Sequence, residues 1–449
     1  MKVVRLAAVF AALTIALFVA QTAQAIQIEV VKAPSSGVTA WLVEDHTNPI
    51  ISISMAWRGG AALDPVGKDG LAELVTSTLD EGAGDMDSQA FQGRMEDLAS
   101  SVHFRAGLDE ISGTFATLTQ HQDDAFDMLR LALTKPRFDD AAVDRVRRQI
   151  TSLLRRDSEN PRAIANRKLM ELQFPGHPYS RDPRGTLETV PLIKTVDLHA
   201  FVGERLARDN LILGVVGDIT PAQLGLKLDK VFGELPEHAK PWALPPASVD
   251  AADRVVVVDK AVPQSVIRWS QPGILRKDPD FFPAYVMNYI LGGGTFESRL
   301  TDEIREKRGL AYSTSSALVT LKQAGLIMGA ADTRNEAAAQ TVDLMRTEWK
   351  KMALGTVSDS ELADAKRFIV GSYALQFSSS GSIASILTGL QLDELGIDYI
   401  DKRAAQINGV TKADIQRIAK RLLMPDKLTV VVVGQPKGIT SRGVAANQP

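Results

Sequence analysis

The chain has 449 residues, of which 45% are hydrophobic and 23% are charged, and its formal net charge is -3. This composition is typical of a globular protein with a sizeable core, and the length indicates two or three domains. The slight excess of acid argues against nucleic acid as a partner, because a duplex binder needs a concentrated positive face. The chain contains no cysteine, which excludes disulfides, thiolate metal sites and a cysteine nucleophile.

The first 25 residues predict a secretory signal peptide. Lys2 and Arg5 precede an uncharged apolar run that ends at the small-x-small sequence Ala23-Gln24-Ala25. A retained membrane anchor is the alternative, but the apolar run is short and leads directly into the cleavage site. We expect cleavage after Ala25 and a periplasmic protein of 424 residues, whose formal charge is -5 because both leader cations are removed.

The remaining chain contains the same pattern twice, which indicates a duplicated domain. Residues 110–133 and 325–352 each read as a strand, a turn and an amphipathic helix, with Asp127 matching Asp343 at an offset of 216. The end of each copy reads as helix, strand and glycine, with Gly217 and Gly434 at an offset of 217. Alternating apolar residues at 50–57 and 101–108 indicate antiparallel strands with one buried face.

Four prolines between residues 234 and 249 mark the boundary between the two copies. The helical segments 141–156 and 281–291 are expected to cover the sheets, one in each copy. The predicted fold class is therefore α+β, with two homologous α/β sandwich domains. The expected division of the chain is signal peptide 1–25, first domain 26–235, linker 236–249, second domain 250–436 and flexible tail 437–449.

Several ordered motifs resemble those of the M16 superfamily, the pitrilysin and insulinase type of zinc peptidase. They are Leu42 to Ala83, Glu159 to Pro161, Phe174 to Tyr179, Leu211 to Ile219 and, most specifically, LGGGTFESRLTDEIREKRGLAYSTSS from Leu291 to Ser316. The resemblance implies the fold of the mitochondrial processing peptidase type. It also implies that the two domains form half of a clamshell that closes around an unfolded peptide.

Catalytic M16 members carry an inverted zinc motif, H-x-x-E-H, whose histidines bind zinc and whose glutamate activates water. In this chain the motif falls on Glu73, Thr76 and Ser77, in the ligand, base and ligand positions respectively. The family's third ligand would fall in the segment 146–156, which contains no acid. A catalytic zinc needs about three protein ligands, so we expect no metal in this chain and no zinc hydrolysis by it alone.

Catalytic clefts of the family also use an arginine and a tyrosine from the opposite half of the molecule, seven residues apart, and this pair falls on Arg305 and Tyr312. A helix end, a left-handed cap at Gly309 and a new strand would let the two side chains converge on a substrate carbonyl. The alternative is that Arg305 complements the helix end while Tyr312 packs on the sheet. Gly292, Gly293 and Gly294 resemble a substrate-binding loop, although alone they could be a helix stop.

The resemblance therefore implies a non-catalytic subunit of a heterodimeric M16 metallopeptidase. Its partner would be a zinc-bearing homologue that holds the zinc, and its substrate would be a peptide or an unfolded segment, with the Arg305 and Tyr312 pair acting in trans. Two alternatives from other classes are a peptide-binding or chaperone-like protein without a peptidase partner, and a structural assembly subunit. The identity of the co-purifying chain discriminates between them.

Overall fold

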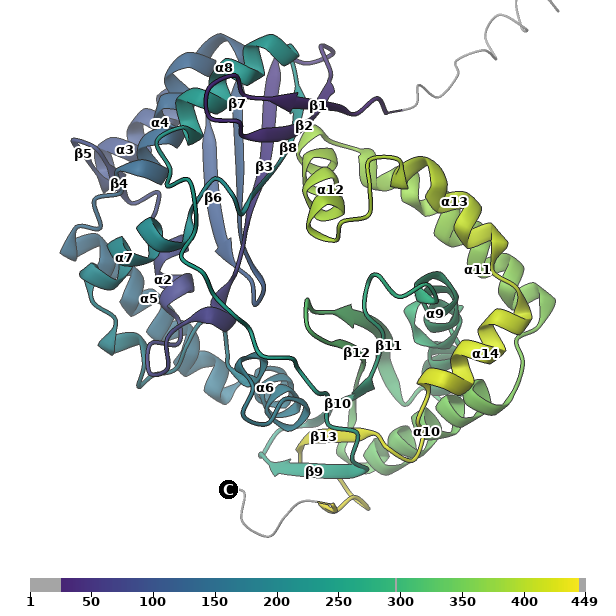
Figure 1. The fold of residues 1–449 in the computed structure, drawn as a ribbon. Helices are drawn as coiled ribbons and strands as arrows, with labels where there is room; N and C mark the ends of the chain where they lie inside the picture. The colour runs from purple at the N-terminus through teal and green to yellow at the C-terminus, as the bar shows by residue number, and fades with distance from the viewer. Residues whose placement is uncertain (1–25, 295–296, 444–449) are drawn as a thin grey trace, which may run out of the picture.

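The computed structural model describes residues 26–294 and 297–443, so the predicted leader lies outside the described residues. Two open sheets, one from each half of the chain, lie apart from one another with helices along their outer sides (Figure 1). The first sheet has six strands in the order β1-β2-β8-β3-β7-β6. Their bounds are β1 (Glu29–Lys32), β2 (Thr39–Glu44), β3 (Ile50–Arg58), β6 (Ser101–Ala106), β7 (Glu110–Leu118) and β8 (Leu211–Gly217).

The second sheet repeats the topology of the first without a counterpart of β1. Its strand order is β11-β12-β10-β13-β9, with β9 (Arg254–Asp259), β10 (Gln264–Pro272), β11 (Ala311–Thr320), β12 (Gly325–Arg334) and β13 (Thr429–Gly434). The β2·β8 pair in the first sheet and the β9·β13 pair in the second are parallel, and the other pairs are antiparallel. The predicted duplication and fold class are thus confirmed, and the predicted strands at 50–57 and 101–108 are antiparallel to their neighbours.

Amphipathic helices cover the outer face of each sheet and close its core. In the first half they are α2 (Leu71–Thr76), α3 (Ser88–Asp97), α4 (Gln122–Thr134), α5 (Asp140–Glu159), α7 (Thr195–Arg205) and α8 (Pro221–Phe232), beside the short β4 (Gly82–Ala83) and β5 (Met86–Asp87). In the second half they are α9 (Phe281–Asn288), α10 (Ala338–Leu354), α11 (Asp359–Gly371), α13 (Tyr399–Gly409) and α14 (Lys412–Leu422). The equivalent helices α4 and α10 follow β7 and β12, as the repeat predicts.

Each half also lends one helix to the inner face of the other half's sheet. Helix α6 (Pro161–Gln173) packs Ala165 and Leu169 against valines of the second sheet. Helix α12 (Ser380–Leu392) packs Ala384 and Leu387 against Val216 of the first sheet, and it lies beside β8 and β3. This exchange explains why β3 is buried along both faces. The alternating apolar residues of its sequence had predicted only one buried face. It ties the two halves together.

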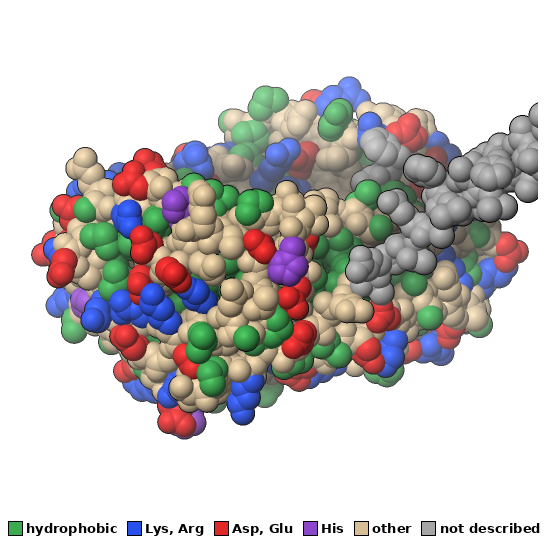
Figure 2. All heavy atoms as spheres, turned by 90° about the horizontal axis from the view of Figure 1, so that it is seen from above, with side chains coloured by type: hydrophobic (Ala, Val, Ile, Leu, Met, Phe, Trp, Pro, Cys, Tyr) green, Lys and Arg blue, Asp and Glu red, His purple; other side chains and the backbone are tan. Residues whose placement is uncertain are grey.

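Residues 236–249, the predicted linker, form neither helix nor strand. Part of the predicted tail does not project freely, because the backbone of Arg442 exchanges hydrogen bonds of 2.8 and 3.0 Å with that of Val255 beside the second sheet. Seen from above, acidic and basic side chains are interspersed and neither sign dominates this face (Figure 2). Among the helices of the described residues, none combines the length and apolar character needed to cross a membrane.

Candidate functional site

The degenerate zinc motif lies on α2, whose first turn is held by a buried carboxyl group. Asp64 accepts hydrogen bonds from the backbone N–H of Gly70 at 3.0 Å and of Ala72 at 3.2 Å. Burial raises the pKa of Asp64 to about 7, although these N–H groups and the nearby Arg181 oppose the shift. Unpaired N–H groups at a helix start need such an acceptor. The helix that carries the motif is therefore formed even though the zinc-binding histidines are absent.

The three motif side chains do not converge as metal ligands. The Thr76 hydroxyl is buried and donates to the Glu73 carbonyl at 3.1 Å, and Ser77 ends the helix. Burial raises the pKa of Glu73, against the opposing charges of Arg184 and Arg105. Within the described residues, no group of three His, Cys, Asp or Glu side chains is placed to hold a metal ion. The donor set at this position does not fit a catalytic zinc, which needs three protein ligands.

Ion pairs surround the Glu73 side of α2. Arg184 pairs with Asp157, from the end of α5, and donates to Asp182 at 3.0 Å, and Arg167 of α6 lies 3.5 Å from Asp182. Asp157 and Asp182 are therefore engaged by guanidinium groups rather than available to a metal. By contrast, no hydrogen bond or ion pair within the described residues engages the carboxylate of Glu73.

The Arg305 and Tyr312 positions flank a tight helix end. Arg305 lies in a π-helical turn, η6 (Thr301–Glu306), and Gly309 follows with a φ of 59°. The Gly309 N–H donates to the Arg305 carbonyl at 2.8 Å, which closes the helix with the left-handed cap that the sequence predicted. β11 then begins at Ala311, so the chain reverses within a few residues and brings Tyr312 back beside Arg305.

A bulge in β11 places the Tyr312 ring in solvent. The register shifts between Ala311 and Thr314, where two residues of β11 lie opposite one residue of β12. Such a bulge re-aims the side chains within it. Tyr312 is 88% exposed, and the guanidinium carbon of Arg305 lies 5.3 Å from its ring centroid. Tyr312 therefore does not pack on the sheet, and the structure brings the two predicted residues together.

The three glycines of the predicted substrate loop have different surroundings. Gly292 lies in the π-helical turn η5 (Tyr289–Gly293), where an added Cβ would approach the Ser316 hydroxyl to 2.5 Å. Gly292 and Gly294 are buried, and Gly293 is exposed. Gly292 thus has a packing role, since it lets η5 approach β11 closely. The substrate-binding role of the loop stays a prediction, and residues 295–296 that follow it lie outside the described residues.

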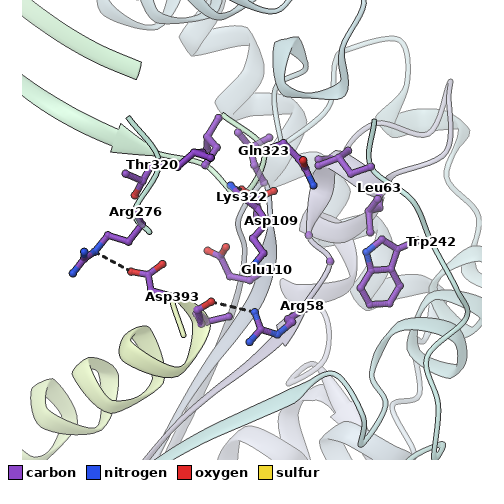
Figure 3. A pocket seen from close by; sticks show the side chains of 18 of the residues that line it. Arg58, Leu63, Asp109, Glu110, Trp242, Arg276, Thr320, Lys322, Gln323 and Asp393 are labelled. Carbon is purple, nitrogen blue, oxygen red and sulfur yellow. Dashed lines mark hydrogen bonds and ion pairs between the residues drawn. The ribbon is translucent and has the colours of Figure 1, made fainter. Parts of the chain in front are cut away.

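Sequence reasoning missed a cavity of roughly 620 Å³ between the two halves (Figure 3). It is bounded by the end of β3, the β6–β7 turn, the β11–β12 turn, the end of α12 and the linker at Trp242. Its charged lining residues include Arg58, Glu110, Arg276 and Asp393. These positions are separated by tens to hundreds of residues, so no local sequence signal could have grouped them.

The comparisons with known proteins agree over both halves of the chain. Residues 193–369 match the family described as Peptidase M16 inactive domain. The chain is 25% identical to the Non-peptidase homolog YmxG of Helicobacter pylori, over 88% of this chain and 91% of that protein. It is 22% identical to the beta subunit of the mitochondrial-processing peptidase of Saccharomyces cerevisiae, over 84% of each. A solved peptidase M16 inactive domain from Pseudomonas fluorescens matches with a TM-score of 0.85 and 24% identity, covering 92% of this chain and 98% of that one.

Proposed function

We propose that this chain is an M16-type protein, as its matches to an M16 inactive domain and to a non-peptidase homologue suggest, and that it is the non-catalytic subunit of a heterodimeric M16 zinc metallopeptidase. The zinc belongs to the partner, a zinc-bearing homologue, and the substrate is a peptide or an unfolded segment. Matches to an inactive domain and to a non-peptidase homologue support the absence of catalytic activity in the chain alone. Similarity to the beta subunit of a processing peptidase supports an M16 partner.

One observation carries the proposal. The chain has Glu73, Thr76 and Ser77 where the zinc motif has its histidines and its glutamate, yet it holds Arg305 beside the exposed ring of Tyr312. Both side chains are hydrogen-bond donors, which suit a substrate carbonyl and the oxyanion that forms from it. An exposed tyrosine ring is not needed for the stability of this chain alone. The pair is therefore suited to act on a site that another chain completes.

Purification from the native host tests this proposal. We expect a zinc-bearing M16 homologue to elute with this chain in size exclusion, and the mixture to cleave an unfolded peptide that neither chain cleaves alone. A homodimer that binds peptides without cleaving them would instead indicate the peptide-binding alternative. Stable incorporation into a larger assembly without peptidase activity would indicate the structural one.

A further inference from the structure

The cavity between the two halves contains one carboxylate that the fold leaves unbalanced. The cationic side chains that line the cavity, by contrast, all contact other groups of the protein. Arg58 donates to the carbonyls of Leu392 at 3.1 Å and Gln391 at 3.2 Å, and Arg276 donates to the Tyr399 hydroxyl at 2.7 Å and lies 3.6 Å from Asp393. Arg58 also lies 3.7 Å from the Glu394 carboxylate, so each of these two guanidinium groups already has a carboxylate neighbour.

The two lysines at the cavity are also paired. Lys277 pairs with Glu394, and the Nζ of Lys322 lies 3.3 Å from the same carboxylate. These two lysines hold the pKa of Glu394 down at about 2. The acid Asp109 is satisfied as well, since it accepts hydrogen bonds from the Tyr179 hydroxyl at 2.6 Å and from the Lys322 backbone N–H at 2.8 Å.

Glu110 differs from these groups. Its carboxylate has no hydrogen bond or ion pair with any described residue, and Glu110 and Asp393 both extend into the cavity (Figure 3). Burial, and then the charges of Asp109 and Asp393, raise the pKa of Glu110, and only Arg105 opposes them. A half-buried carboxylate without a partner carries a desolvation cost that a bound cation would offset.

Apart from Thr320 and Gln323, the rest of the lining is small or apolar and suits a long hydrocarbon stem. It is contributed by Leu63, Leu108, Trp242, Leu244, Leu275 and Leu321. Small-ligand pockets commonly range over about 300–1,000 Å³, with apolar walls and a few polar groups that set specificity. A cavity of roughly 620 Å³ with one unpaired carboxylate has this character.

We propose that this cavity binds the long basic side chain, arginine or lysine, of a peptide. The methylene stem packs on the leucines and Trp242, and the cationic head pairs with Glu110. An apolar side chain would leave the Glu110 carboxylate buried without a partner, and an acidic one would add a like charge beside it. The inference does not rest on the proposed function, because this chain alone builds the cavity.

Calorimetry on the mature chain tests the proposal with two short peptides, both acetylated and amidated so that the side chain is their sole cation. One carries a central arginine among alanines, and the other carries citrulline, which is neutral and nearly isosteric. We expect the arginine peptide to bind about 10-fold tighter or more, because a charge-assisted pair is lost with citrulline. Binding should also change the tryptophan fluorescence, and Trp242→Phe should abolish that change.

Glu110→Gln should remove the preference for arginine, whereas Glu96→Gln, an equal loss of charge on the outer helix α3, should leave it unchanged. Equal affinity of the two peptides for the native chain, or no binding of either, would overturn the proposal. So would an arginine preference that survives in Glu110→Gln. The peptide pair and the fluorescence change use the native cavity, so the test stands even if a variant fails to fold.

Discussion

The guanidinium carbon of Arg305 lies 5.3 Å from the ring centroid of Tyr312, although the two residues stand on opposite sides of a helix end. The left-handed turn at Gly309 and the bulge after Ala311 produce this approach. A cation over a tyrosine face is attracted by the ring, which favours this arrangement of the two side chains. Because Tyr312 is 88% exposed, its hydroxyl remains accessible to another molecule.

Tyr312→Phe should leave assembly with the partner intact and lower peptidase activity of the complex. The variant loses only a hydroxyl, and removal of one oxyanion donor typically costs on the order of 10²-fold in turnover. Arg305→Ala should lower activity at least as much, with an added loss of substrate binding if the guanidinium holds the peptide backbone. Steady-state kinetics on an unfolded peptide measures both effects, after size exclusion has checked association.

Arg308→Ala is the matched control for this pair. Arg308 bonds to the Glu303 carboxylate at 2.5 Å and to its carbonyl at 2.8 Å, so its side chain is engaged within its own helix end. We expect a small effect on activity. Full activity in the Tyr312→Phe complex would show that the Tyr312 hydroxyl has no chemical role. The chain would then contribute only to enclosing the substrate.

The isolated chain should bind no stoichiometric zinc and cleave no unfolded peptide. The Thr76 hydroxyl donates to a carbonyl of its own helix, and Ser77 is the residue at which that helix ends. Glu73 would therefore be the sole ligand of the motif. A single carboxylate does not hold zinc against dialysis. Metal analysis after dialysis against trace zinc measures this, with a zinc-bearing homologue as the positive control. One tightly held zinc per chain would show that a site has been missed.

The local parts of the fold could be predicted from sequence, and the contacts between the two halves could not. The β3 segment, α5, the Gly309 cap and the repeat all follow from residue spacing within one segment. By contrast, nothing in the sequence of α12 specifies that it packs on the first sheet rather than its own. The cavity shares this origin, since Glu110 and Asp393 meet only after that exchange.

The mature protein should begin at Ile26 and be exported to the periplasm. The prediction rests on the charged start, the apolar run and the Ala23-Gln24-Ala25 site, which together form a signal peptide. N-terminal sequencing of protein from the native host measures it. A retained Met1 in membrane fractions would show that the segment is an anchor.

Asp64→Asn should flatten the dependence of stability on pH between about 4 and 7. Burial raises the pKa of Asp64 to about 7, so in this range the folded state holds a proton that the unfolded state has released. Stability is therefore fully present at low pH and falls as pH rises through the folded pKa, by an amount on the order of 4 kcal/mol. Denaturant unfolding across this pH range should show the native chain losing stability relative to the variant. Parallel curves would contradict the raised pKa, and Asp426→Asn, at an exposed position, is the control.

Gly214→Ala should destabilise the protein at the point where α12 crosses the first sheet. A Cβ on Gly214 of β8 would lie 2.3 Å from the Ala384 carbonyl oxygen and 2.9 Å from the Leu387 Cβ, so the helix must move outward. Helix α12 is also held there by hydrogen bonds, from the Thr388 hydroxyl to the Ser54 carbonyl at 3.1 Å and from the Gln391 amide to the Leu213 carbonyl at 2.8 Å. Any outward shift lengthens both bonds.

Overpacking of this kind typically costs about 1–3 kcal/mol, and here it acts on the helix that joins the two halves. We therefore expect a lower denaturant midpoint for Gly214→Ala, measured by circular dichroism. The Arg58 bonds to the end of α12 should weaken with it, so the arginine peptide should also bind the cavity less tightly. Gly381→Ala is the matched control, because it lies in the first turn of the same helix and an added Cβ meets no atom within 4 Å. An unchanged midpoint in Gly214→Ala would mean that α12 rests loosely on the sheet and does not tie the two halves together.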